Sequence, residues 1–126
     1  MATIVKLGLS ADEERAAAVE LLRNPETRPS IVLCFNEMLA INVYQAAREL
    51  SLKIPDDVSV VGIGGTYLSE LLGPPMTMMD IFPRELGERS ARLLLRVLRK
   101  QTGRRLITET IKPRLRVGGS VLSLNG

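Results

Sequence analysis

The stretch that decides the fold is residues 30–65, SIVLCFNEMLAINVYQAARELSLKIPDDVSVVGIGG. Two apolar runs, at 30–35 and 58–63, flank a segment whose apolar residues recur at helical spacing. Because the two runs are almost continuously apolar, we expect each to be a strand that is covered on both faces. The helix between them carries the chain back to the edge where it started, so this order predicts a parallel sheet.

The segment before this stretch predicts a further strand and helix. Residues 3–7 are rich in β-forming side chains. Ser10 and Glu13 have the spacing of a capping box, in which each side chain accepts a hydrogen bond from the other residue's backbone N–H. They predict the start of a helix that runs to Arg23 and buries an apolar stripe that includes Leu22.

The segment after this stretch predicts two more strands and a long helix. Residues 77–81 can form a strand, and Pro83 suits the first turn of a helix that ends near Lys100. Residues 106–117 alternate loosely and contain Pro113, as expected of an edge strand. Together the elements predict an α/β fold with an open parallel sheet and flanking helices.

The composition excludes several classes of function. A chain of 126 residues has room for one domain or for part of a larger one. The absence of His removes Ser-His-Asp and Cys-His catalysis and the commonest metal ligand, so we expect no enzyme, metal or cofactor. One Cys cannot form an internal disulfide, and no apolar run is long enough to span a membrane, so we expect a cytoplasmic protein.

Positive charge is concentrated toward the C-terminus. Residues 84–116 hold 11 Lys and Arg against three Glu, whereas the whole chain carries a net charge of +3. Four of these cations form a stripe at helical spacing: Arg89, Arg92, Arg96 and Arg99. We interpret the stripe as a solvated helix face, and contact with phosphates or an acidic partner is the alternative.

Polar residues and glycines follow two neighbouring strands of the predicted sheet. Asn36 and Glu37 come after the first apolar run, and Gly64 and Gly65 come after the second. Ligands of open α/β sheets bind beyond the carboxyl ends of the strands. The Asn36 amide suits a ligand rich in hydroxyls or ring nitrogens, or it only caps the following helix. The glycines allow close approach of the backbone to a ligand, or they only form a tight turn.

Four sulfur-containing side chains lie in or near these apolar strands. Cys34 has no His to activate it, so we interpret it as a packing residue. Met76, Met78 and Met79 cluster at the next predicted strand. Adaptable packing is the default interpretation of this cluster, and an apolar ligand pocket is the alternative.

Several motifs, in order, resemble those of the LacI/GalR family of bacterial transcriptional regulators. Residues 31–40, IVLCFNEMLA, are similar to the family's apolar strand followed by Asn-Asp-x-x-Ala. Residues 54–62, IPDDVSVVG, resemble the family segment vPeDvsvvG. Residues 75–81, PMTMMDI, resemble its hinge strand, and residues 113–120, PRLRVGGS, parallel its closing LxxRxS stretch. The resemblance covers about residues 30–120.

The resemblance implies part of a two-lobed effector-binding core of the periplasmic-binding-protein type. In this scheme residues 1–75 form the C-terminal lobe and 76–83 a hinge strand. Residues 84–102 form a helix that packs on the other lobe, and 104–120 form the closing strand. A small molecule, a sugar or a nucleobase, binds between the lobes and changes the affinity of an N-terminal helix-turn-helix for operator DNA.

The same resemblance implies the partners of the protein. No counterpart of the DNA-binding headpiece is found in the sequence, so we expect part of a longer regulator. We expect a homodimer that binds a small-molecule effector and contacts operator DNA only through the missing headpiece, with no membrane partner.

The resemblance also implies five effector-binding candidates, which are Asn36, Glu37, Gly64, Ile81 and Phe82. Asn36 matches the family's Asn, which contacts the effector in several members. Glu37 replaces the usual Asp with a longer side chain, and Gly64 stands where many sugar-binding members have an Asp. Phe82 occupies the place of a common Pro, where an aromatic ring can cover an apolar effector.

Two other function classes stay open from the sequence. A solute-binding protein for transport shares the implied fold. The upstream sequence distinguishes the two classes, because a transport protein has a cleavable leader there and a regulator has a helix-turn-helix. The other class is an enzyme or a phosphorylated receiver on a doubly wound sheet. For that class the sequence lacks a His, a phosphate-binding loop and an Asp at the ends of the two central strands.

Overall fold

The computed structural model describes residues 5, 10–99 and 107–123. Its elements, in chain order, are α1 (Ala11–Arg23), β1 (Ile31–Leu33), α2 (Glu37–Glu49), β2 (Ser59–Gly64), the 3-10 turn η1 (Tyr67–Glu70), β3 (Thr77–Asp80), α3 (Pro83–Leu98) and β4 (Arg114–Arg116). This order confirms the strand–helix–strand prediction for residues 30–65. Of the strand predicted at 3–7 only Val5 is described, without regular structure, and the other residues lie outside the described ones.

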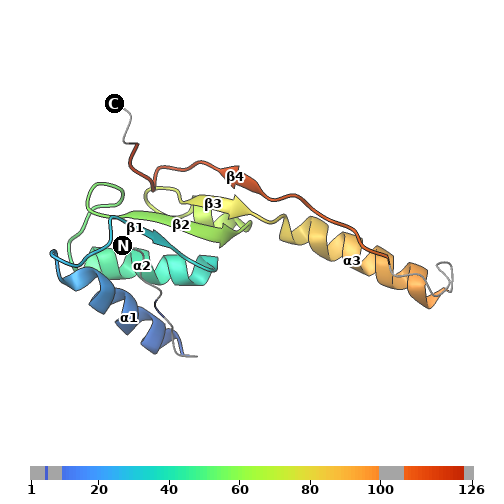
Figure 1. Ribbon diagram of the computed structural model, residues 1–126, viewed down its shortest axis with the longest axis horizontal. Helices are drawn as coiled ribbons and strands as arrows, with labels where there is room; N and C mark the ends of the chain where they lie inside the picture. Colours follow the sequence, from blue (N-terminus) through green and yellow to red (C-terminus); the bar gives the residue numbers. More distant parts are fainter. Residues whose placement is uncertain (1–4, 6–9, 100–106, 124–126) are drawn as a thin grey trace.

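The strands form one sheet in the order β1-β2-β3-β4 (Figure 1). β1, β2 and β3 are parallel, as predicted, with Leu33 opposite Val61 and Gly64 opposite Asp80. β4 occupies the edge, as predicted, but among the described residues of the predicted strand at 106–117 only Arg114–Arg116 is a strand, since Pro113 lacks the N–H that would extend the pairing. β4 is also antiparallel to β3, so the sheet is mixed. The chain leaves β3 along α3 and returns from the far end of that helix, which reverses the direction of β4 (Figure 1).

The core lies between the sheet and two helices. α2 packs against the sheet and α1 packs beside α2 (Figure 1). The capping box that starts α1 is present, because Ser10 and Glu13 exchange side-chain-to-backbone hydrogen bonds of 3.2 Å. Leu22, Val60 and Met78 are completely buried in this core, and each contributes about 1.5–3 kcal/mol through the burial of apolar surface.

The prediction that β1 is covered on both faces is wrong. Ile31 is 52% exposed and Leu33 is 70% exposed, whereas Cys34, which points to the helix side, is 4% exposed. The cause is that α1 and α2 lie on the same side of the sheet, and no described helix covers its other face. The apolar sequence of β1 therefore predicts two buried faces, but the described residues cover only one of them.

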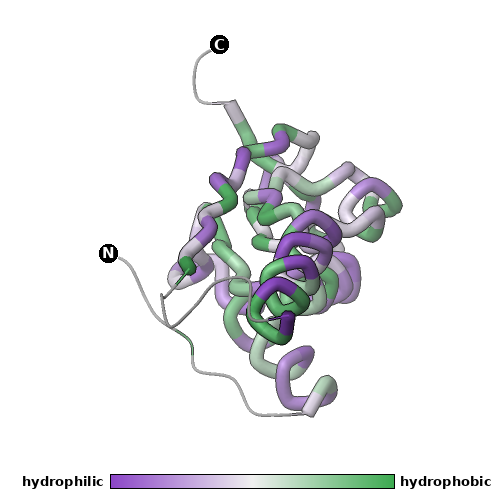
Figure 2. Tube along the Cα trace, turned by 90° about the vertical axis from the view of Figure 1, so that its right-hand side faces the viewer, coloured by the Kyte–Doolittle hydropathy of each residue, from purple (hydrophilic) through white to green (hydrophobic). Residues whose placement is uncertain are grey.

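α3 extends away from the body of the molecule, and none of its side chains is buried (Figure 1). A view along its axis shows hydrophobic residues on one side and hydrophilic residues on the other (Figure 2). Leu86, Leu94 and Val97 on the apolar side are 47–58% exposed. The arginine stripe is solvated, as predicted, and Arg89 forms an ion pair with Glu85 one turn away. None of the described helices is long and apolar enough to cross a membrane.

Ser120 fastens the C-terminal segment to the sheet and is completely buried. Its hydroxyl accepts a hydrogen bond of 2.8 Å from the Thr77 N–H and donates one to the Val60 carbonyl. Direct pairing of β2 with β3 begins at Val61 and Thr77. The hydroxyl therefore bridges the two strands at the point where their ladder starts.

Candidate functional site

The carboxyl ends of β1, β2 and β3 meet at one end of the sheet (Figure 1). We call this place the rim and define it as residues 34–37, 64–66 and 80–82. The Thr66 N–H donates to Glu37 Oε1 at 3.1 Å, and the Ile81 N–H donates to the Gly64 carbonyl at 2.7 Å. These two bonds tie the three segments together. The structure thus brings the five predicted candidates to one place, and their contact with an effector stays a prediction.

Asn36 caps α2. It has an extended backbone, and its Oδ1 accepts a hydrogen bond of 2.8 Å from the Leu39 N–H. The capping interpretation is therefore confirmed. The cap uses only the amide oxygen, and the exposed side chain keeps two N–H donors that have no partner among the described residues. Capping and ligand binding are consequently compatible at this position.

Glu37 is the first residue of α2, and only 8% of its surface is exposed. Its carboxylate lies over Gly64, since a Cβ added to Gly64 would lie 2.6–2.7 Å from Cγ, Cδ and Oε2 of Glu37. Gly64 is thus required for space. The Thr66 N–H and the N-terminus of α2 both favour the negative charge of this carboxylate.

A second buried carboxylate, that of Asp80, lies against Gly65. Its Oδ1 accepts a hydrogen bond of 2.7 Å from the Phe82 N–H, and its Oδ2 faces Arg116 Nε at 3.3 Å. Arg116 also binds Glu70 at 2.9 Å. Gly65 has a φ of +141°, which L side chains rarely adopt, and an added Cβ would collide with Asp80. Position 65 therefore requires glycine both for its backbone conformation and for space.

Phe82 joins β3 to α3 in a left-handed conformation, with φ 51° and ψ 59°. This conformation is uncommon for a bulky residue. The guanidinium of Arg114 lies 6.0 Å from the centre of the half-buried ring, within the range of a cation–π contact. A hollow of about 320 Å³ borders the ring, and Gly65 and Asp80 are among its other lining residues. The ring therefore lines this hollow, and its contact with an effector stays a prediction.

Three charged residues were not predicted as candidates: Asp80, which belongs to the rim, and Arg114 and Arg116, which lie next to it. Asp80 is the only charged residue in residues 76–81, and that isolation was a signal in the sequence. The two arginines reach the rim because β4 pairs with β3, which sets Arg114 opposite Asp80. This contact joins segments 34 positions apart, so local sequence patterns do not reveal it.

The buried sulfur-containing side chains serve packing, as predicted. Cys34 is 4% exposed, and burial raises the pKa of its thiol to about 12. Met76 and Met78 are buried in the same core. In the described part of the chain, no group of three or more His, Cys, Asp or Glu side chains could hold a metal ion.

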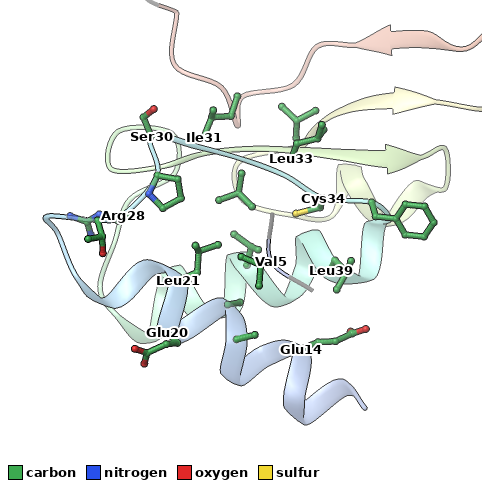
Figure 3. Close-up of a pocket in the computed structure, with 18 residues that line it drawn as sticks. Val5, Glu14, Glu20, Leu21, Arg28, Ser30, Ile31, Leu33, Cys34 and Leu39 are labelled. Carbon is green, nitrogen blue, oxygen red and sulfur yellow. The ribbon is translucent and has the colours of Figure 1, made fainter. Parts of the chain in front are cut away.

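A larger hollow of about 1360 Å³ lies between α1 and β1 (Figure 3). Val5, Leu21, Cys34 and Leu39 are among its lining residues, and Figure 3 shows them between the strand and the helices. β1 has no strand on its outer side among the described residues. An apolar trough beside an unpaired strand edge suits a further strand better than a small polar ligand, so the candidate site is the rim.

A family model described as a periplasmic binding protein-like domain matches residues 2–121. Curated relatives include the HTH-type transcriptional repressors PurR of Vibrio campbellii, 31% identical over 100 residues, and of Mannheimia succiniciproducens, 34% identical over 96 residues. These alignments cover 79% and 76% of this chain but 30% and 28% of the relatives. The chain thus spans about a third of the length of these curated relatives.

Solved structures agree with this assignment. A LacI family transcriptional regulator from Arthrobacter sp. FB24 in complex with lactose has a TM-score of 0.78 and 32% identity, over 92% of this chain and 44% of that one. A regulator from Enterococcus faecium with bound ribose has a TM-score of 0.82 at 24% identity, over 94% of this chain and 43% of that one, and supports the fold alone. Because the family model matches nearly the whole sequence and the similar proteins are LacI-type regulators, this chain belongs to the periplasmic binding protein-like domain family, in its LacI/GalR group.

Proposed function

We propose that this chain is the effector-sensing part of a LacI/GalR-type transcriptional regulator, and that its effector binds at the rim. The observation that carries the proposal is the placement of Asn36 and Glu37 beside Gly64. Free amide donors and a carboxylate lie there at the carboxyl ends of parallel strands, where α/β sheets bind ligands. The similar regulator in complex with lactose favours a sugar-class effector, and a nucleobase is the second class.

Each candidate residue has a role in this proposal. Asn36 donates hydrogen bonds through its amide nitrogen, and Glu37 accepts them. Gly64 leaves room for the Glu37 carboxylate. Phe82, which lines the hollow of about 320 Å³, and the exposed Ile81 beside it in the sequence supply apolar contacts.

We assign residues 1–75 to the C-terminal lobe and 76–83 to the hinge strand. We assign residues 84–102, which include most of α3, to a segment whose apolar side is covered in the assembled protein, and 104–120, which include β4, to the closing segment. The exposed apolar side of α3 supports the third assignment. Exposed apolar patches of this kind mark contact surfaces, and we propose that the isolated chain covers this one with a second copy.

The regulator acts on operator DNA through a helix-turn-helix headpiece outside these 126 residues, in the cytoplasm and without catalysis. The relatives named as HTH-type repressors support this view. The alternative, a solute-binding protein for transport, is not favoured because the similar proteins reported above are transcriptional regulators.

Binding measurements on Asn36 variants test the proposal. In Asn36→Asp the carboxylate oxygen still caps α2, but the two amide donors are lost. We expect Asn36→Asp to weaken effector binding about 10-fold or more, because each lost hydrogen bond contributes about 0.5–1.5 kcal/mol. Isothermal titration calorimetry of the regulator that contains this chain, against lactose, ribose and nucleobases, measures this change.

The matched control is Ser10→Ala, which removes the cap of α1 away from the rim. It costs about 1 kcal/mol of stability and leaves affinity unchanged. Equal affinity of the wild type and Asn36→Asp for every bound compound removes Asn36 from the site.

A further inference from the structure

Glu37 is a buried carboxylate whose hydrogen-bonding capacity is largely unused. Its exposed fraction is 8%, and its Oε1 accepts one hydrogen bond from the Thr66 N–H. Its Oε2 accepts none from the described residues, and no described Lys or Arg nitrogen lies within 4 Å of the carboxylate. A carboxylate offers about four acceptor positions, so several remain unfilled.

Asp80 provides an internal comparison, because it is equally buried at 8% exposure. Its two oxygens face the Phe82 N–H and the Arg116 guanidinium. Of the two carboxylates that flank the glycine pair, one is neutralised by a cation and the other is not. Burying a charge without a paired cation is costly, so an additional hydrogen-bond donor at Glu37 is favourable.

Gly64 determines which group a ligand meets at this point of the rim. The Glu37 carboxylate occupies the space of a side chain at position 64, with Oε2 2.7 Å from the place of the missing Cβ. The acceptor at the end of β2 is therefore supplied by α2. Because Thr66 holds the other oxygen, Oε2 is fixed in position, and a fixed acceptor gains more from a hydrogen bond than a mobile one.

We propose that Glu37 Oε2 selects the effector by charge: it accepts a hydrogen bond from an O–H or N–H group of a neutral or cationic molecule and rejects phosphorylated or carboxylated ones. This inference rests on the proposed function, because it concerns the same rim. The net charge of +3 and the Arg114 guanidinium beside Phe82 both attract anions, so a preference for neutral ligands would oppose the surrounding positive charge. A measured preference for neutral ligands would therefore indicate the effect of a nearby carboxylate.

The test is a two-dimensional NMR titration of this chain with D-ribose, lactose and hypoxanthine, and with ribose 5-phosphate as the anionic partner of ribose. Glu37→Gln keeps the size of the side chain and the acceptor for Thr66 but removes the charge. Glu26→Gln, an exposed charge removal in the turn after α1, is the matched control. The backbone amides of Gly65 and Thr66 and the side-chain amide of Asn36 report on the rim, and the remaining spectrum verifies the fold of each variant.

We expect a neutral probe to shift the Gly65 and Thr66 signals. Glu37→Gln should weaken this binding about 10- to 100-fold, the range for loss of one hydrogen bond to a charged group. Ribose 5-phosphate should bind more weakly than ribose to the wild type, and the difference should shrink in Glu37→Gln but persist in Glu26→Gln.

Two failures have different meanings. If a probe shifts the Asn36 amide but binds Glu37→Gln as tightly as the wild type, or if ribose 5-phosphate binds as tightly as ribose, the charge selection is refuted and the rim site survives. If no probe shifts any rim signal, the proposed function and this inference both fail.

Discussion

Removal of the Ser120 hydroxyl tests how the C-terminal segment is held to the sheet. Ser120→Ala deletes one oxygen atom from a completely buried site and adds no bulk. That oxygen accepts from the Thr77 N–H at 2.8 Å and donates to the Val60 carbonyl. The backbone bond from the Val60 N–H to the Ser120 carbonyl, at 2.9 Å, does not depend on the side chain. The substitution therefore isolates the bridge between β2 and β3.

The expected loss follows from the two groups left behind. A buried donor or acceptor without a partner costs about 1–3 kcal/mol. The substitution leaves one donor, the Thr77 N–H, and one acceptor, the Val60 carbonyl, without the side-chain partner. The strands can approach slightly and recover part of it, so we expect a total of about 2–4 kcal/mol. That is a large fraction of the 5–15 kcal/mol typical of a domain, roughly 10 °C in Tm.

Urea unfolding followed by far-UV circular dichroism measures this loss as a lower midpoint with an unchanged slope. Ser90→Ala, on the exposed surface of α3, is the control and should change stability by less than about 0.5 kcal/mol. A loss of less than about 0.5 kcal/mol for Ser120→Ala would show that the closing segment is not docked in solution, and the reasoning would be refuted.

Three further outcomes are expected. Because burial raises the pKa of Cys34 to about 12 from an ordinary 9.0, only the unfolded thiol ionises between pH 9 and 12. Stability should fall there by up to about 1.4 kcal/mol per pH unit more than in Cys34→Ala, as equilibrium unfolding across this range measures. Gly64→Ala should cost about 1–3 kcal/mol by overpacking, and Glu37→Ala in the same chain should relieve most of it; additive losses in a double-mutant cycle would contradict the contact. Leu94→Glu, on the apolar side of α3, should abolish concentration-dependent association in sedimentation, and a wild-type chain that stays monomeric would refute that surface.

Local interactions explain why most elements were predictable. The capping box of Ser10 and Glu13 and the cap of Asn36 involve residues three positions apart. Apolar residues at helical or strand spacing lie close together in the sequence, so their pattern alone predicts the element. The parallel pairing of β1, β2 and β3 follows because a helix or turn returns the chain to the same edge each time.

The candidate site was predictable in part, for the same reason. Parallel strands place their carboxyl ends together, so Asn36 and Gly64 were expected at one rim. The position of the Glu37 carboxylate over Gly64 is a contact between residues 27 positions apart. The hydrogen bond of Glu37 with Thr66 and the burial of its side chain depend on how α2 packs on β2, which no local pattern specifies.

By itself, the sequence determined the order of strands and helices, their caps and the family to which the chain belongs. Only the tertiary structure decided that one face of β1 is uncovered, that Arg116 neutralises Asp80 but not Glu37, and that Ser120 bridges β2 and β3. The physical reason is range: hydrogen-bond caps and periodic burial act over a few residues, whereas charge pairing and coverage of a sheet depend on segments that meet only after the chain has folded.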